Sequence, residues 1–340
     1  MSETAVVILA AGEGKRMRSR RPKVLHPLGG RPLIAYPVRS ARALGGRVFV
    51  VVSRESEELR RAVGGNRAGG DEVGGGEAGS GDIGFVEQKE PRGTGHALLQ
   101  CRGATPESAG TILVIPGDSP LLSAETLRRL LTHHERTGAA ATLLTAEVSH
   151  PTGYGRVLRD KGQVVSIVEE RDTFPEQQKI REVGTSVYCF DPGLLWSALE
   201  QVKPNNDQGE YYLTDLIGIL ARAGRRVEAV TVEDPDECLG INDRKQLARC
   251  AQLLRRRTLE RLMTGGVTVL DPETTYVDDS VTVGSDSVIY PGVVLEGTTV
   301  IGEECVIGLG SYVTGSRVGD RVTLQPYCVL TDSVVEDDAT

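Results

Sequence analysis

The sequence contains no hydrophobic run that approaches the roughly 18–20 residues needed to span a bilayer. Its first apolar stretch, within MSETAVVILAAG, has no basic residues before it, so it predicts a strand rather than a signal peptide. The six cysteines show no CxxC spacing, and the five histidines do not cluster with them. These absences argue against membrane insertion, a disulfide framework and a zinc site. They predict a cytoplasmic protein with reduced thiols.

Basic residues are also in deficit, because 39 Lys and Arg stand against 47 Asp and Glu, a net charge of −8. Generic nucleic-acid binding needs a basic surface, so no nucleic-acid partner is expected. Positive charge is nevertheless concentrated locally, since seven Lys or Arg lie among the first 31 residues. An acidic protein of this kind can still bind a phosphate-rich small ligand near its N-terminus.

The 340 residues divide into two kinds of pattern and predict two domains. In residues 1–243, the apolar runs AVVILAA, RVFVVVS, TILVIPGD and AATLLTAEV predict buried strands of a largely parallel sheet. Helical patterns alternate with them at 33–44, 55–63, 94–101 and 123–136. The last has Ser123 as its candidate N-cap and Gly138 just past its end. This alternation predicts an open α/β sheet that binds ligands at the carboxyl ends of its strands.

Two segments depart from this alternation. Ten glycines in the 21 residues of 64–84 predict a mobile surface loop, because such a segment cannot form a core. A pattern rich in Leu and Arg then predicts a linker helix over 244–264, before the pair Gly265-Gly266.

Residues 265–340 carry an internal repeat, in which an aliphatic residue recurs at every sixth position with one five-residue step. The positions are Val283, Ile289, Leu295, Ile301, Ile307, Val313, Val318, Leu324 and Leu330. This period predicts a left-handed parallel β-helix whose aliphatic side chains point into a prism-shaped core. A solenoid normally ends in an atypical capping repeat, and none precedes Thr340. We therefore expect a partial β-helix and a longer natural protein.

A glycine-bearing loop from Leu9 to Lys23 follows the first predicted strand. Gly12 and Gly14 let backbone N–H groups approach a triphosphate, and its charge can be offset by Lys15, Arg16 and Lys23. A Walker A loop needs G-K followed by Ser or Thr, but arginine follows here. A dinucleotide fingerprint needs a third glycine, and methionine occupies that place. The form that remains is L-A-A-G-x-G-x-R-M, followed by P-K-V-L-H.

Further motifs follow in order along the chain: E-Q at 87–88, R-G-T-G-H-A at 92–97, P-G-D at 116–118, P-T-G-Y-G-R at 151–156, I-V-E at 167–169, N-N-D-Q-G-E-Y-Y-L-T-D at 205–215 and G-I-N-D at 240–243. Over the whole chain, this series closely resembles the bifunctional N-acetylglucosamine-1-phosphate uridyltransferase/glucosamine-1-phosphate N-acetyltransferase family. The resemblance implies a Rossmann-like nucleotide-diphospho-sugar transferase domain. It also implies that UTP and N-acetylglucosamine 1-phosphate give UDP-N-acetylglucosamine and pyrophosphate, for cell-wall and lipopolysaccharide precursors.

This reaction needs no general base, because the sugar phosphate is already an anionic nucleophile. Catalysis should be positioning plus cationic stabilisation. The resemblance implies Arg16 and Lys23 as the catalytic cations, Mg²⁺ as the cofactor, and Asp118 and Asn242 as its ligands. Oxygen ligands suit Mg²⁺, which keeps several waters. Asp118 ends the apolar run TILVIPGD, where an α/β sheet presents its ligands.

The remaining substrate contacts are also implied by the resemblance. For the base they are Leu9, Ala10, Ala11, Gly12, Gln88, Gly93 and Thr94. For the sugar they are Gly155 and Glu169, while Lys23, Gly117, Asp118 and Asn242 complete the substrate-binding set. A glutamine amide and backbone groups can satisfy both the donors and the acceptors of a uracil edge.

One departure from the family leaves the sugar open. The family commonly has Asn before Thr-Gly where this chain reads E-V-G-T-S, and Gly184 has no side chain to bind a sugar hydroxyl. Another sugar-1-phosphate nucleotidyltransferase, of the glucose-1-phosphate type, therefore stays an alternative. A non-catalytic nucleotide-sensing module is a second alternative, against which the intact phosphate- and metal-binding residues argue. The family assembles trimers through the β-helix, so a homotrimer is expected. Its acetyltransferase residues would lie beyond Thr340, so no acetyl transfer is expected of this chain.

Overall fold

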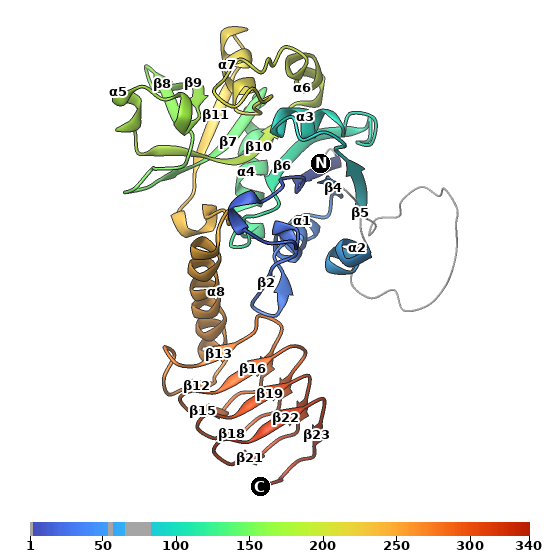
Figure 1. Ribbon diagram of the computed structural model, residues 1–340, viewed down its shortest axis with the longest axis vertical. Helices are drawn as coiled ribbons and strands as arrows, with labels where there is room; N and C mark the ends of the chain where they lie inside the picture. The colour runs from blue at the N-terminus through green and yellow to red at the C-terminus, as the bar shows by residue number, and fades with distance from the viewer. Residues whose placement is uncertain (1–2, 54–56, 65–82) are drawn as a thin grey trace, which may run out of the picture. The chain divides into compact units, whose positions relative to one another are not determined.

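The computed structural model describes residues 3–53, 57–64 and 83–340, which form two compact units (Figure 1). The first unit comprises Pro32–Asp243 and the described residues before Pro27. The second comprises Arg244–Thr340 and the short segment Pro27–Arg31, which holds strand β2 (Pro27–Leu28) and the start of β3 (Arg31–Pro32). The glycine-rich segment predicted to be a mobile loop lies almost wholly outside the described residues.

The first unit is built on a nine-stranded sheet with the main order β11-β7-β10-β6-β1-β4-β5. These strands are β1 (Glu3–Leu9), β4 (Arg47–Val52), β5 (Ile83–Glu87), β6 (Ala109–Pro116), β7 (Ala141–Glu147), β10 (Glu182–Phe190) and β11 (Val227–Thr231). Alternate residues of β1 enter two different apolar clusters: Ala5 and Val7 join one, and Val6 and Ile8 join the other. The sheet is therefore covered on both faces, which explains why its strands are continuous apolar runs.

The sheet is largely parallel, as predicted, and strand β10 is an exception that runs antiparallel to both β6 and β7. The pairs β11–β7, β6–β1, β1–β4 and β4–β5 are parallel. Beside β10 lies an antiparallel hairpin of β8 (Arg156–Asp160) and β9 (Gln163–Val168). Strand direction depends on the connecting segments rather than on side-chain periodicity, so the apolar pattern could not reveal this reversal.

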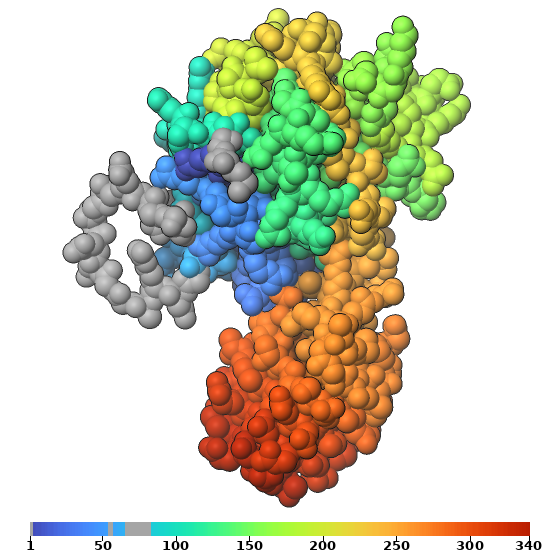
Figure 2. All heavy atoms as spheres, turned by 180° about the vertical axis from the view of Figure 1, so that it is seen from behind, coloured from blue at the N-terminus to red at the C-terminus, as the bar shows by residue number. Residues whose placement is uncertain are grey.

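Helices lie between the strands: α1 (Ala35–Arg42), α2 (Glu57–Gly64), α3 (Thr94–Leu99), α4 (Ala124–Thr137), α5 (Pro175–Gln178), α6 (Pro192–Leu199) and α7 (Asp215–Arg222). The predicted frame of α4 is confirmed, because Ser123 Oγ accepts the Thr126 N–H at 3.1 Å. The helix ends at Gly138, whose φ of 57° favours glycine. One side of α4 is exposed, and its residues lie on the surface of the first unit in Figure 2 (green).

Apart from the segment Pro27–Arg31, the second unit consists of α8 (Arg244–Thr264) and coils of short parallel strands. These strands stack in the orders β12-β15-β18-β21, β13-β16-β19-β22 and β14-β17-β20-β23 (Figure 1). Their bounds are Thr268–Val269 (β12), Tyr276–Val277 (β13), Thr282–Val283 (β14), Val288–Ile289 (β15), Val294–Glu296 (β16), Val300–Ile301 (β17), Val306–Ile307 (β18), Tyr312–Thr314 (β19), Arg317–Val318 (β20), Thr323–Leu324 (β21), Val329–Thr331 (β22) and Val334–Val335 (β23). Three stacked sheets of this kind agree with the predicted partial left-handed β-helix.

The aliphatic positions of the repeat point into this β-helix as predicted. The buried ones are Ile289, Leu295, Ile301, Ile307, Val313, Val318 and Leu324. Val283 and Leu330 are partly buried and pack against the same core. Buried hydroxyl groups, which the repeat did not reveal, add hydrogen bonds between coils. Ser287 Oγ, for example, donates to the Gly302 carbonyl at 2.9 Å.

Candidate active site

The loop after β1 folds back on itself so that Gly14 meets Lys23. Gly14 has a φ of +63°, and a Cβ at this residue would lie 2.7 Å from Lys23 Cβ. Glycine is therefore required for the loop to close against Lys23 without a clash. Gly12 is different, because no heavy atom lies within 4 Å of a Cβ placed there. The loop is thus tight at Gly14 and open at Gly12, where a ligand could approach the backbone.

The carboxyl ends of β1 and β6 approach each other closely beside this loop. The Gly117 N–H donates to the Leu9 carbonyl at 2.9 Å. A Cβ at Gly117 would lie 2.9 Å from Ala10 Cβ, so a larger residue would push the strand ends apart. Ala10 and Ala11 are both buried. Four of the predicted substrate-binding residues therefore lie together at this edge of the sheet.

Lys23, Asp118 and Asn242 meet at the same edge. The Ile241 N–H donates to the Asp118 carbonyl at 2.9 Å, which brings the G-I-N-D segment beside the end of β6. Lys23 Nζ forms an ion pair with Asp118 Oδ2 and donates to Asn242 Oδ1 at 3.2 Å. The side chains of Lys23 and Asp118 are only 11% and 20% exposed. Asp118 and Asn242, which follow Lys23 by 95 and 219 positions in the sequence, thus both contact its ammonium group.

The two oxygens that contact Lys23 could also hold a metal ion. An ammonium group stands between a carboxylate oxygen and an amide oxygen, so both oxygens point at one cation position. Hard divalent cations bind such oxygens and complete their shell with water or substrate phosphates. Within the residues that the structure describes, no three His, Cys, Asp or Glu side chains gather into an all-protein metal site. The pair therefore suits a cation that also takes ligands from the substrate.

Arg16, the second predicted cation, lies in the short turn η1 (Lys15–Met17), and its side chain is exposed. Among the described residues, no hydrogen bond or ion pair joins it to Lys23 or Asp118. Its neighbour Met17 is 1% exposed. The buried methionine fixes the backbone of the turn, while the Arg16 guanidinium faces solvent.

A second group of predicted residues lies around Gln88, which directly follows β5 and is buried. The Gln88 amide Nε2 donates to the Gly93 carbonyl at 3.1 Å and lies 2.9 Å from His96 Nδ1. Gly93 has a φ of +102°, and a Cβ there would lie 2.7 Å from the Tyr211 carbonyl oxygen. The turn at Gly93 and Thr94 is thus packed against the chain near Tyr211. Sequence reasoning did not single out His96, whose only signal was its place in R-G-T-G-H-A.

A third group lies around Glu169, which directly follows β9. The Gly184 N–H donates to the Gly155 carbonyl at 2.9 Å. A Cβ at Gly155 would lie 3.5 Å from Glu169 Oε2. On the other side, Thr214 Oγ1 donates to Glu169 Oε1 at 3.0 Å. Sequence reasoning did not single out Thr214, whose signal was its place in Q-G-E-Y-Y-L-T-D.

The Glu169 carboxyl lies in an environment that disfavours its charge. Burial raises its pKa, and the charges of Asp172 and Asp215 raise the pKa further, while the hydrogen bond from Thr214 lowers it. The Tyr188 hydroxyl is also buried, with no hydrogen-bond partner in the described part of the chain. Burial and the charge of Glu169 raise the pKa of Tyr188.

Arg156 holds the backbone on either side of this third group. It is 1% exposed, and its Nη2 lies 2.6 Å from Glu170 Oε2, while Nη1 donates to the Tyr154 carbonyl. Arg156 begins β8 directly after Gly155, and Glu170 directly follows Glu169. An ion pair between the buried Arg156 and the partly exposed Glu170 therefore ties together the two segments that carry the predicted sugar-binding residues.

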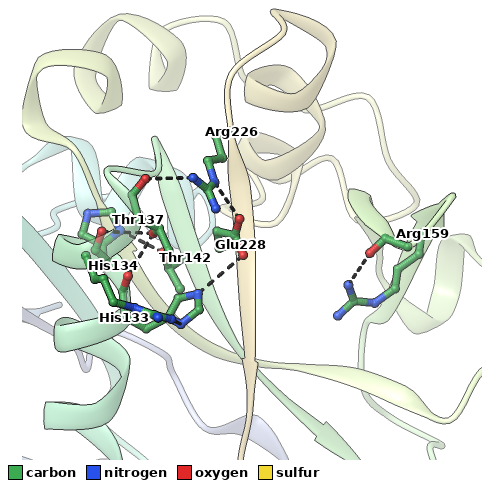
Figure 3. Close-up of polar contacts among 9 residues, drawn as sticks. His133, His134, Thr137, Thr142, Arg159, Arg226 and Glu228 are labelled. Carbon is green, nitrogen blue, oxygen red and sulfur yellow. Dashed lines mark hydrogen bonds and ion pairs between the residues drawn. The ribbon is translucent and has the colours of Figure 1, made fainter.

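A separate polar cluster lies where α4 faces β11 (Figure 3). Glu228 accepts from Arg226 Nε at 2.7 Å and lies 3.4 Å from His133 Nε2. On the inner side, His134 Nδ1 lies 2.9 Å from Thr142 Oγ1. Burial lowers the pKa of His134, which favours its neutral form. This cluster contains none of the predicted site residues, and its groups join α4 to the sheet.

Comparison with known proteins identifies the family. The profile of the MobA-like NTP transferase domain matches residues 6–183. A protein named "Bifunctional protein GlmU" from Syntrophotalea carbinolica is 46% identical over 333 residues, which cover 98% of this chain and 69% of that protein. The protein of the same name from Pelotomaculum thermopropionicum is 47% identical over 334 residues, 98% of this chain and 70% of that protein. The protein of that name from Lactobacillus delbrueckii subsp. bulgaricus is 41% identical over 338 residues, which cover 99% of this chain and 70% of that protein.

Two further findings bear on the kind of protein. Within the described ranges, no helix has both the length and the apolar character that a membrane crossing requires. Nucleotidyltransferases of this type generally use a divalent metal, and the oxygens of Asp118 and Asn242 suit one. Identity above 40% over nearly the whole chain shows that it belongs to the GlmU family, as a sugar-phosphate nucleotidyltransferase of the UDP-N-acetylglucosamine diphosphorylase type.

Proposed function

We propose that this chain transfers UMP from UTP to N-acetylglucosamine 1-phosphate, giving UDP-N-acetylglucosamine and pyrophosphate, with Mg²⁺ as its metal. The observation that carries this proposal is the convergence of Lys23, Asp118 and Asn242 on one cation position at the carboxyl edge of the sheet. Open α/β sheets bind their ligands at this edge. In the proposed division of labour, residues 1–243 carry the reaction, 244–264 form the linker, and 265–340 form the partial β-helix.

The residues at the cation position suit a displacement at phosphorus. The phosphate of the sugar phosphate is the nucleophile and is already ionised, so no side chain has to remove a proton. Lys23 and Arg16 would contact the triphosphate and offset the charge that develops as pyrophosphate leaves. Asp118 and Asn242 would hold Mg²⁺, which when bound supplies further positive charge to the phosphate oxygens. The proposed catalysis is therefore positioning and electrostatic stabilisation.

Recognition of the uracil base is proposed at the open part of the loop. Leu9, Ala10, Ala11 and Gly12 would line this part of the loop. The Ala10 N–H already donates to the Val51 carbonyl, whereas the open space at Gly12 supports close approach of a ligand to the backbone. On the opposite side of the base, the contacts would come from Gln88, Gly93 and Thr94. The hydrogen bond from Gln88 Nε2 to the Gly93 carbonyl supports this grouping, because it fixes the orientation of the amide. The amide oxygen of Gln88 would then accept the N3–H of the base.

Recognition of the sugar is proposed at Gly155 and Glu169, with Gly117 completing the substrate contacts near the phosphates. Glu169 has one oxygen held by Thr214, and its second oxygen lies 3.5 Å from the place that a Cβ at Gly155 would occupy. A carboxylate can accept hydrogen bonds from two sugar hydroxyls, so the second oxygen is available to a substrate. A Cβ at Gly155 would lie 2.8 Å from Ile167 Cγ2, which explains why glycine is needed there.

A second candidate function is supported by one observation, the glycine at position 184. Gly184 lies beside Gly155, and it offers only backbone groups where the family commonly has an asparagine side chain. A site without that side chain would discriminate less between N-acetylglucosamine 1-phosphate and glucose 1-phosphate. Glucose 1-phosphate is therefore the competing substrate.

Assembly into a homotrimer is proposed through the outer faces of the β-helix. Outward-facing residues of β13 and of the turns, among them Tyr276 and Tyr290, are 54% and 40% exposed in the single chain. Apolar groups on a flat face favour association, and cyclic symmetry closes such contacts. Light scattering after gel filtration would give about three times the 36.5 kDa chain mass if this proposal is right. A mass equal to one chain would contradict it.

The substrate proposal is tested by measuring pyrophosphate release with a panel of nucleotides and sugar phosphates. Release should be fastest with UTP and N-acetylglucosamine 1-phosphate, and it should require Mg²⁺. Faster turnover of glucose 1-phosphate would transfer the assignment to the second candidate. Binding of UTP without release from any sugar phosphate would contradict both.

A further inference from the structure

We propose that Thr214 is a positioning residue, which fixes the Glu169 carboxylate so that its second oxygen faces the sugar of the substrate. This inference rests on the proposed role of Glu169 in sugar binding. The hydrogen bond from Thr214 Oγ1 to Glu169 Oε1, at 3.0 Å, is the contact that carries it. Glu169 makes no other side-chain hydrogen bond within the described residues, so its orientation depends on this threonine.

The backbone at the start of α7 lets the Thr214 hydroxyl make a tertiary contact. Thr214 immediately precedes α7 as its N-cap residue, yet its side chain makes no capping hydrogen bond. A capping threonine has an extended backbone, whereas Thr214 is helical, with φ −60° and ψ −29°. Backbone carbonyls accept the first N–H groups of α7 instead, as in the 3.3 Å bond from Asp215 to Tyr212. The Thr214 hydroxyl donates to Glu169, and the residue is 7% exposed. The helix therefore does not need this hydroxyl, and its buried hydrogen bond to Glu169 points to a role at the site.

The segment before Thr214 is itself fixed to the proposed nucleotide-binding turn. The Tyr211 N–H donates to the Arg92 carbonyl at 2.8 Å, and the Tyr211 carbonyl accepts from Gly95 at 2.7 Å. Two residues later, the Leu213 N–H donates to Thr94 Oγ1 at 3.0 Å. The Thr214 hydroxyl is therefore presented to Glu169 from a rigid support. The segment links the side that would bind the base to the side that would bind the sugar.

The charges around Glu169 explain why it needs this donor. Asp172 in the turn after β9 and Asp215 in α7 both disfavour its ionised form, and the buried Tyr188 of β10 adds no hydrogen bond to a described residue. Arg222 compensates Asp215 rather than Glu169. The hydroxyl of Thr214 favours the ionised carboxylate, which is the form that accepts hydrogen bonds with both oxygens. Without this donor, the pKa of Glu169 should rise further.

The test compares Thr214→Val with Thr214→Ser in steady-state kinetics over a range of pH. Thr214→Val should raise the KM for the sugar phosphate about tenfold, because a hydrogen bond to a charged group is lost. The KM for UTP should stay within about twofold. The acidic limb of kcat/KM for the sugar phosphate should move to higher pH, because Glu169 takes up its proton more readily. Thr214→Ser keeps the hydroxyl and should restore both properties.

Thr142→Val is the matched control, because it removes another buried threonine hydroxyl with a hydrogen bond inside the same unit (Figure 3). It should change neither KM nor the pH profile. If Thr214→Val folds poorly, Thr214→Ala provides the same comparison. In a Glu169→Gln background, loss of the Thr214 hydroxyl should cause no further shift in the pH profile.

The positioning role is refuted if Thr214→Val leaves the sugar-phosphate KM and the pH profile unchanged, or if it weakens UTP and sugar phosphate equally. Failure of the proposed function gives a different result, because wild-type protein would then release no pyrophosphate with N-acetylglucosamine 1-phosphate. In that event, calorimetric titration with UDP-N-acetylglucosamine replaces the kinetics. Thr214→Val should bind this nucleotide sugar about tenfold more weakly than wild type, and equal binding by both would overturn the proposal.

Discussion

Replacement of Lys23 by methionine should make the nucleotide-free protein bind a divalent cation more tightly. The Lys23 ammonium occupies the position between Asp118 Oδ2 and Asn242 Oδ1, so a metal ion has to displace it before binding the same oxygens. Methionine fills similar space but carries no charge, so it no longer competes with a metal ion for the cation position. The prediction is counterintuitive for a residue proposed to assist catalysis, because turnover should fall while metal affinity rises.

The size of the effect follows from the contacts that the metal has to break. A hydrogen bond to a charged group contributes about 1.5–3 kcal/mol, and both side chains of the ion pair are largely buried. If the metal ion no longer has to break one such hydrogen bond of Lys23, its affinity should rise by about tenfold to a hundredfold. Arg16→Met is the matched control, because it removes the same charge from an exposed side chain of the same loop. A screened, exposed charge should change the affinity by less than about threefold.

The assay is a titration of the free protein with Mn²⁺, followed by the paramagnetic resonance signal of the unbound ion. Tighter binding by Lys23→Met than by both Arg16→Met and wild type is the expected result. Equal affinities for the two variants would show that Lys23 acts only through its general charge, and the reasoning about displacement would then be wrong.

Three further predictions concern the sugar side of the site. Ser186→Val should lower the free energy of unfolding in urea by about 1–2 kcal/mol, because the φ of Ser186 is +62° and a β-branched residue is strained there. Ser186→Gly should not lower it, and equal effects of the two substitutions would refute this reason. Gly184→Asn should increase several-fold the preference in kcat/KM for N-acetylglucosamine 1-phosphate over glucose 1-phosphate, because the amide can bind the sugar. The side chain fits, since a Cβ there meets only Ile167 at ordinary contact distances. An unchanged ratio would argue against a sugar contact. Glu169→Gln should raise the melting temperature at pH 8, because a raised pKa means that the ionised carboxylate destabilises the folded state. That gain should vanish as the pH falls below the ordinary value of 4.5, where the folded and unfolded states both hold the proton, and a gain that persisted in acid would need another cause.

The features that could be predicted from the sequence are those written as a repeated or local pattern. The six-residue period placed Ile289, Leu295 and Ile301 in the core because each coil repeats the same environment. The frame of α4 was likewise local, since Ser123 and Gly138 act on their own helix ends. By contrast, the direction of β10 depends on how distant segments connect, and no residue within the strand reports it.

In the candidate site, too, single residues could be predicted from local motifs, whereas the contacts between them could not. Resemblance to known motifs named Lys23, Asp118 and Asn242 one by one, but their meeting depends on the close approach of strand ends across the whole sheet. Thr214 lies inside a recognised motif, yet the motif alone does not say which of its side chains faces Glu169. That contact requires β9 and the start of α7 to be placed together. The roles assigned to all these residues in catalysis stay predictions.

The central claim, that the edge of the sheet at Asp118 is where a nucleotide is joined to a sugar phosphate, is tested most directly by Asp118→Asn. The substitution keeps the size of the side chain and removes its charge, so the fold should survive, as circular dichroism can verify. The account predicts that Mg²⁺-dependent pyrophosphate release from UTP and N-acetylglucosamine 1-phosphate falls by at least about a hundredfold, the effect of losing one major electrostatic group. Release at the wild-type rate by a folded Asp118→Asn protein would contradict it.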